Sequence, residues 1–74
     1  MTAIIRPTSA LKSYIDGKDE IEVEAGRTVR ETLISINIKP ELIALVVVNG
    51  EQKEKDYLIQ DGDIVKVLAV IGGG

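Results

Sequence analysis

The clearest local signal in this 74-residue chain is the start of one amphipathic helix. Thr28 and Glu31 have the spacing of a capping box, in which the Thr hydroxyl accepts an N–H of the first turn and the Glu reaches back. The apolar residues that follow at helical spacing are Val29, Leu33 and Ile36. Asn37 can adopt the left-handed conformation that ends a helix. We therefore expect a helix over residues 28–37.

Strand-like segments lie on both sides of this helix. Residues 20–24 alternate between Glu and Ile or Val, which is typical of a strand with one face in water. Residues 42–48 are continuously apolar, so we expect a strand buried on both faces in the middle of a sheet. The other expected strands are residues 2–6, ending at Pro7, residues 51–56 as a short charged edge, and residues 64–71.

The connections between these segments define the fold class. Residues 8–18 are polar and are expected to form a loop with at most one helical turn, whereas Asn49-Gly50 and Asp61-Gly62-Asp63 are turn signals. The order is strand, strand, helix, strand, short strand, strand. Because crossover connections are right-handed, the first and last strands can lie side by side at the sheet centre. The sequence predicts an α+β fold of the β-grasp type, a mixed four- to five-stranded sheet with one main helix packed across it.

Composition excludes most catalytic chemistry for the chain itself. The absence of Cys and His removes thiolate nucleophiles, imidazole bases and the usual zinc ligands, so no catalytic residue, metal or bound cofactor is expected. A net charge of −3 disfavours nucleic-acid binding. No stretch approaches the ~18 apolar residues of a membrane span, and no signal-peptide pattern is visible. We expect a cytoplasmic domain that is monomeric when free.

The last expected strand runs directly into Gly72, Gly73 and Gly74. Three glycines form a thin tail that extends roughly 10 Å at ~3.3–3.6 Å per residue. A carboxylate on such a tail can enter a channel that is too narrow for side chains. The alternative is a frayed terminus without a function. We predict a domain over residues 1–71 and a flexible tail over residues 72–74.

Several turns and the tail together resemble one known family. Val48-Asn49-Gly50-Glu51, Ile59-Gln60-Asp61-Gly62-Asp63 and Val70-Ile71 before Gly73-Gly74 occur in the order seen in the ubiquitin-like sulfur carriers, the ThiS and MoaD proteins. The junction from Glu22 to Val29 is similar to the entry into that family's helix. The similarity spans residues 4–74, and the order of the motifs is more specific than any one of them.

This resemblance implies a carrier rather than an enzyme. An E1-like adenylating enzyme would use ATP to activate the Gly74 carboxylate, and a sulfur donor such as a cysteine desulfurase would convert it to a thiocarboxylate. A sulfur-accepting synthase would then take the sulfur. Gly73 and Gly74 match the family diglycine, and Gly72 occupies a position that usually holds another small residue.

Two features point to different members of the family. The tail lacks the Pro-Pro pair typical of MoaD proteins, which favours ThiS and sulfur donation to the thiazole of thiamine. The long segment from Arg6 to Glu20 is more like MoaD, the small subunit of molybdopterin synthase. A carrier for tRNA thiolation, a ubiquitin-like protein modifier and a plain interaction module also remain open.

The last strand also predicts a partner surface. If Lys66 faces water, then Ile64, Leu68 and Val70 share its side and form an apolar stripe leading to the tail. The core side would then hold Val65, Val67, Ala69 and Ile71. We expect the stripe to dock partner proteins, unless the register is shifted by one residue or both faces are covered. The acids of residues 49–63 could steer a basic partner or could simply be solvated; they are Glu51, Glu54, Asp56, Asp61 and Asp63.

Overall fold

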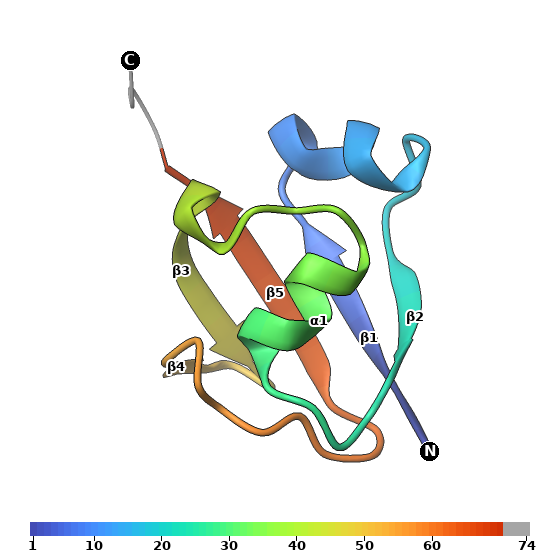
Figure 1. The fold of residues 1–74 in the computed structure, drawn as a ribbon, viewed down its shortest axis with the longest axis vertical. Coiled ribbons are helices and arrows are strands. Elements are labelled where there is room, and N and C mark those ends of the chain that lie inside the picture. The colour runs from blue at the N-terminus through green and yellow to red at the C-terminus, as the bar shows by residue number, and fades with distance from the viewer. Residues whose placement is uncertain (71–74) are drawn as a thin grey trace.

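The computed structural model describes residues 1–70. Along the chain these residues form β1 (Thr2–Pro7), the 3-10 helix η1 (Ser9–Ile15), β2 (Ile21–Glu24), α1 (Val29–Ser35), the 3-10 helix η2 (Pro40–Leu42), β3 (Ile43–Val48), β4 (Glu51–Lys53) and β5 (Ile64–Ala69). The sheet order is β2-β1-β5-β3-β4. The central strands β1 and β5 are parallel, and the other neighbouring pairs are antiparallel. This is the predicted β-grasp, with α1 across one face of the sheet (Figure 1).

The helix begins where the capping box predicts and ends slightly earlier. The Thr28 hydroxyl accepts the Glu31 N–H at 3.1 Å, and the Glu31 carboxylate accepts the Thr28 N–H at 3.0 Å. The bond from the backbone of Thr28, followed by that from its hydroxyl, lowers the pKa of Glu31. Asn37 has a φ of 64°, which confirms the predicted left-handed stop. The helix itself covers residues 29–35 because its last turn tightens at Ile36.

Residues 8–18 are more ordered than the predicted loop. They contain η1, whose Leu11 and Ile15 are 3% and 4% exposed. The polar pattern hid this element, because only these two widely spaced side chains reach the core. η1 lies over one end of the sheet on the same side as α1 (Figure 1). This helix therefore closes an end of the core that a solvated loop would leave open.

Strand β1 extends through Pro7, although a proline was expected to end it. Ala25 donates its N–H to the Met1 carbonyl at 3.0 Å. The backbone N–H and C=O groups of the odd-numbered residues of β1 therefore point toward β2. The ladder with β2 stops at Ile5. The N–H that Pro7 lacks would point to a place where no partner strand lies, so no ladder bond is lost. On its other side the chain continues its bonding to β5, because Thr8 donates its N–H to the Val67 carbonyl at 3.1 Å.

Strand β3 is not buried on both faces, which corrects the expectation for residues 42–48. Ile43, Val46 and Val48 are buried, whereas Leu45 and Val47 are partly exposed. Leu42 belongs to η2, and the register shifts between Ile43 and Leu45. No helix or strand of residues 1–70 covers the sheet face opposite α1 (Figure 1). An apolar run therefore does not imply two covered faces.

The core is aliphatic, as the composition predicted. Its largest fully buried side chains are Ile5, Val29, Leu33, Ile38, Val46, Ile59, Val65 and Val67. They come from the three central strands, α1 and the loops that follow α1 and β4. None of the helices within residues 1–70 has the length and apolar character of a membrane span.

Asp63 is a polar anchor inside the turn that precedes β5. The carboxylate is 6% exposed and accepts bonds of 2.8 Å each from the Asn49 amide, the Tyr57 hydroxyl and the Gln60 N–H. Burial raises the pKa of Asp63, but these bonds outweigh burial and leave the pKa below its ordinary value. The hydrogen bond that the Tyr57 hydroxyl donates to Asp63 raises the pKa of Tyr57.

We expect Asp63→Asn to lower the free energy of unfolding at pH 7 by about 1.5–3 kcal/mol, the usual value of bonds to a charged group. The side-chain amide of the new Asn would place an N–H donor against the donors that now bond to the Asp63 carboxylate. Because the folded-state pKa is lowered, ionised Asp63 stabilises the fold above about pH 4, and this contribution is lost as the pH falls through the folded-state pKa. Urea titrations at several pH values should show the gap between variant and wild type closing below about pH 4.

The matched control is Asp61→Asn in the same turn. Asp61 is exposed and accepts the Thr2 N–H at 3.1 Å, a bond that an amide oxygen can also accept. This control should therefore change stability little. Equal losses in the two variants, or a gap independent of pH, would contradict the role of the ionised Asp63.

Candidate functional site

The candidate site begins where β5 delivers the chain to the tail. β5 lies between β1 and β3, and its inward side chains Val65 and Val67 are fully buried. At its end Val70 donates its N–H to the Leu42 carbonyl at 2.8 Å. The chain therefore leaves residue 70 from a strand that is paired with a neighbouring strand on each side.

The predicted reacting residue Gly74 and the tail residues Gly72 and Gly73 lie outside the described residues, as does Ile71. Their roles and the boundary after residue 71 stay predictions. The described geometry does define the starting point, because Val70 is the last residue with a tertiary hydrogen bond in the described chain. Four residues beyond Val70 can span at most roughly 14 Å.

The predicted inward and outward sides of β5 agree with the structure for residues 64–70. Ile64 and Leu68 are partly buried, Lys66 is exposed, and Val70 is 46% exposed. Ala69 is only partly buried against the core. The register places Ile64, Leu68 and Val70 on a surface that leads to the tail, while their docking role stays a prediction.

This apolar surface is wider than the stripe predicted from the last strand alone. On the neighbouring strands, Ile4 lies opposite Ile64, and Leu45 lies opposite Leu68. Val47 lies beside Lys66, and all three of these neighbours are partly exposed. We call the set Ile4, Leu45, Val47, Ile64 and Leu68 the open sheet face. The sequence carried a signal for it, since residues 42–48 are apolar at every position, but that signal was assigned to burial.

Cations border the open sheet face near the start of the tail. A shallow groove there is lined by Arg6, Lys12 and Lys66 together with Asp19 and Glu20. Arg6 pairs with Glu20 at 2.9 Å, and Lys12 pairs with Asp19 at 2.8 Å. The Lys12 bond lowers the pKa of Asp19. The surface around the tail is therefore mixed in charge, although the whole chain is acidic.

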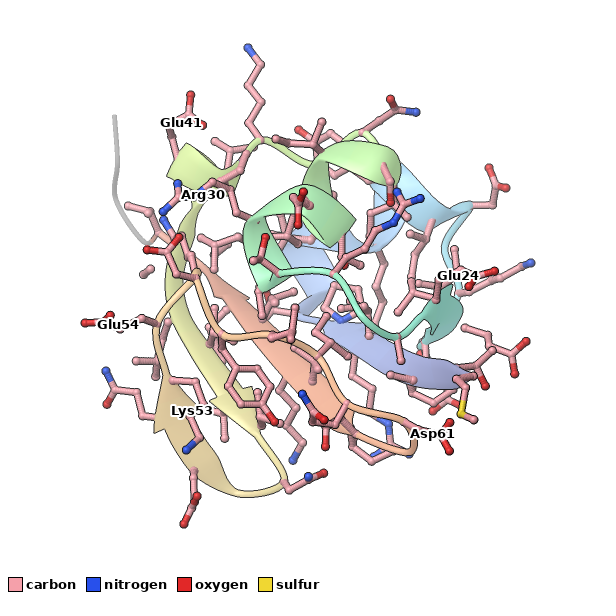
Figure 2. All side chains as sticks on the ribbon, turned by 60° about the horizontal axis from the view of Figure 1, so that its bottom comes forward. Glu24, Arg30, Glu41, Lys53, Glu54 and Asp61 are labelled. Carbon is pink, nitrogen blue, oxygen red and sulfur yellow. The ribbon has the colours of Figure 1, made fainter. Side chains whose placement is uncertain are left out.

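The acids of residues 49–63 do not form one exposed rim. Asp63 is buried, while Asp56 approaches Arg30 at 3.4 Å and Glu51 approaches Lys53 at 3.4 Å. Asp61 lies in the turn before β5, at the opposite end of that strand from the tail (Figure 2). Four of the five acids thus have local partners, and an acidic rim that steers a basic partner is not favoured.

The groups that the described chain offers for chemistry are few. Among residues 1–70 no cluster of acidic, His or Cys side chains has the arrangement of a metal site. The whole sequence contains neither Cys nor His. The described residues supply a packed core and an apolar face, and the sequence beyond them ends in three glycines. These features suit a chain that other proteins recognise and modify.

Comparisons with known proteins agree with this geometry. A family model described as the ThiS family matches residues 9–74. A molybdopterin converting factor, subunit 1, from Pyrococcus furiosus has a similar structure, with a TM-score of 0.71 and 22% identity over 96% of this chain and 99% of that one. SAMP1 from Haloferax volcanii is also similar, with a TM-score of 0.70 and 16% identity over the full length of both chains. At these identities the structural matches establish the fold.

Proposed function

We propose that this chain, which belongs to the ThiS family of ubiquitin-like sulfur carriers, donates sulfur from a Gly74 thiocarboxylate to thiazole formation in thiamine biosynthesis. The observation that carries the proposal is the family match, which extends from residue 9 to the last glycine. The tail supports the thiamine assignment, because Ala69-Val70-Ile71 precedes the glycines without a Pro-Pro pair.

The chemistry requires only a carboxylate from this chain. The Gly74 carboxylate attacks the α-phosphate of ATP, pyrophosphate leaves, and an acyl-adenylate forms. A sulfur nucleophile then attacks the acyl carbon and expels AMP. Sulfide yields the thiocarboxylate directly, whereas a protein persulfide yields an acyl disulfide that a further thiol must reduce. Apart from the Gly74 carboxylate, the reacting groups come from ATP and the sulfur donor, and the E1-like enzyme supplies the catalytic groups; this chain contains neither Cys nor His.

A MoaD-type role as the small subunit of molybdopterin synthase is the second candidate. The connection that holds η1 is longer than the tight first turn usual in ThiS, and the Pyrococcus furiosus neighbour carries a molybdopterin title. Carriage of sulfur for tRNA thiolation and attachment to proteins use the same activated carboxylate. These roles differ in the partner that receives the activated chain rather than in the chemistry at Gly74.

The deciding experiment measures activation by defined partners. The protein is mixed with ATP and the adenylating enzyme of either the thiamine or the molybdopterin pathway, and ATP–pyrophosphate exchange is followed. We expect exchange with the thiamine enzyme and, with a sulfur source, a mass increase of ~16 Da for oxygen replaced by sulfur. Exchange with the molybdopterin enzyme alone would favour the second candidate. Exchange with neither enzyme would contradict both candidates and leave activation by another E1-like enzyme, for tRNA thiolation or protein attachment, or an interaction module.

Leu68→Glu should weaken binding to the activating enzyme about 10-fold or more, because it places a charge at the centre of the open sheet face. Leu68 is only half-buried, so the free energy of unfolding should fall by less than about 1 kcal/mol. Calorimetry of the complex and urea titration of the free protein measure the two effects.

Ile34→Glu is the control for this surface. Ile34 is 59% exposed on α1, on the other side of the sheet, so the same charge there should leave binding unchanged. Unfolding of the Leu68 variant would mean that Leu68 belongs to the core. Equal loss of binding in both variants would remove the open sheet face as the docking surface.

A further inference from the structure

The free edge of the sheet at β2 has no function in the proposed chemistry. β2 is the terminal strand of the sheet, and no strand within residues 1–70 pairs with its outer side. In Figure 1 it runs along the right-hand border of the sheet, away from β3 and β4. A free strand edge offers main-chain bonding groups to any extended chain that reaches it.

The register identifies the backbone groups that face outward. Ala25 donates its N–H to the Met1 carbonyl at 3.0 Å, and bonded pairs alternate with non-bonded pairs in an antiparallel ladder. The bonded pairs that follow are Ala3 with Val23 and Ile5 with Ile21. The N–H and C=O groups of Glu22 and Glu24 must therefore point away from β1. An added strand would bond to these two residues.

A groove accompanies this edge on the inner side of the sheet. It has a volume of about 250 Å³ and lies between β2 and α1. Three charged residues, Glu22, Glu24 and Arg27, line it together with Val23, Thr32, Ser35 and the half-buried Ile36. Side chains of an added strand that point toward α1 would enter the groove beside Ile36. Aliphatic residues suit these positions, because they would bury apolar surface against the existing core.

The other side of the edge is acidic. Glu22 and Glu24 are exposed on the sheet face away from α1, and neither forms an ion pair with another residue of 1–70. Glu24 lies at the border of the molecule opposite Glu54 and Lys53 (Figure 2). Opposite charges on directly facing strand positions stabilise a pair, and like charges destabilise it. Two copies joined edge to edge would bring these glutamates together, which disfavours a second copy as the occupant.

We propose that the β2 edge binds an extended segment of a partner protein in which aliphatic residues alternate with Lys or Arg. The aliphatic side chains enter the groove beside Ile36, and the basic side chains lie next to Glu22 and Glu24. Glu22 lies directly across from Ile4 at the border of the open sheet face, whereas the groove lies on the opposite side of the sheet, between β2 and α1. The proposal does not rest on sulfur transfer.

The test uses a short synthetic peptide in which Val and Lys alternate. Titration into isotope-labelled protein should shift the amide signals of residues 21–24 and of α1. Two control peptides test the same contacts without any change to the protein. One carries N-methyl groups on the backbone positions that would bond to β2, and the other replaces Lys with Glu. Both controls should bind at least about 10-fold more weakly, because they remove the main-chain bonds and the charge match respectively.

Protein variants separate backbone bonding from charge. Glu22→Pro removes an outward N–H without breaking the ladder to β1, which an edge strand tolerates, and should weaken binding at least about 10-fold. Glu22→Gln combined with Glu24→Gln keeps the N–H groups and should weaken binding about 3- to 10-fold at low salt, with the difference disappearing at high salt. The matched control is Glu54→Gln, at the opposite edge of the sheet, which should bind like the wild type.

Four results would overturn the proposal: undiminished binding of the N-methylated peptide, wild-type binding by folded Glu22→Pro protein, shifts confined to the open sheet face, or no binding at all. If Glu22→Pro fails to fold, the N-methylated peptide decides the question. Sedimentation of the free protein tests the other possible occupant of the β2 edge, a second copy of this chain. A dimer that the double Gln variant strengthens would assign the edge to a second copy instead.

Discussion

Gly73→Ile is expected to reduce ATP–pyrophosphate exchange by at least about 100-fold, the loss that small misplacements of reacting groups produce. In the proposed function the carboxylate of Gly74 passes through a narrow channel to reach the α-phosphate of ATP, and a branched side chain one residue away could not follow it. The length of the tail is unchanged, so a loss of exchange would reflect only the greater width of the tail at residue 73. Exchange with the activating enzyme and mass spectrometry of the product are the measurements.

Deletion of Gly74 is the companion variant for this experiment. It shortens the tail by ~3.5 Å and still leaves Gly72-Gly73 at the end, so it tests reach rather than width. Both variants should unfold at the wild-type urea concentration, because the described core and its hydrogen bonds end by Val70. Wild-type exchange in Gly73→Ile protein would contradict the passage of the tail through a narrow channel.

Leu33→Ala is expected to lower the free energy of unfolding by about 2–5 kcal/mol, as for other buried large-to-small changes. Leu33 is fully buried where α1 packs on the sheet, and α1 is the one α-helix among residues 1–70. The cavity would open in the middle of a small core that has no disulfide to compensate. Urea titration followed by circular dichroism measures the change.

Ile34→Ala is the control for the helix. Ile34 is the next residue on α1 and is 59% exposed, so its truncation should change stability by less than about 0.5 kcal/mol. A loss below about 1 kcal/mol for Leu33→Ala would show that the helix does not pack on the sheet through this face. Because Ala is a better helix former than Leu or Ile, similar losses in both variants would contradict the assignment of Leu33 to the buried side and Ile34 to the exposed side of α1.

The sequence by itself determined those elements whose signals are local. The capping box at Thr28 and Glu31, the left-handed stop at Asn37 and the alternation around Val23 act within a few residues, and the structure confirms each of them. The order of these elements, with right-handed crossovers, was sufficient to predict that the first and last strands lie side by side, and in the structure β1 and β5 form a parallel pair. The diglycine was also visible as a motif, since its chemistry needs no folded neighbour.

Only the tertiary structure decided which side chains meet across long distances. Pro7 stays within β1 because the ladder to β2 has already ended there, and η1 forms because Leu11 and Ile15 find the core. Asp63 is a buried anchor because Asn49 and Tyr57 reach it from other turns. Burial and hydrogen-bond partners depend on what lies next to a residue in space. A pattern along the chain records only the spacing of residues, so it could not distinguish a covered strand face from the open one.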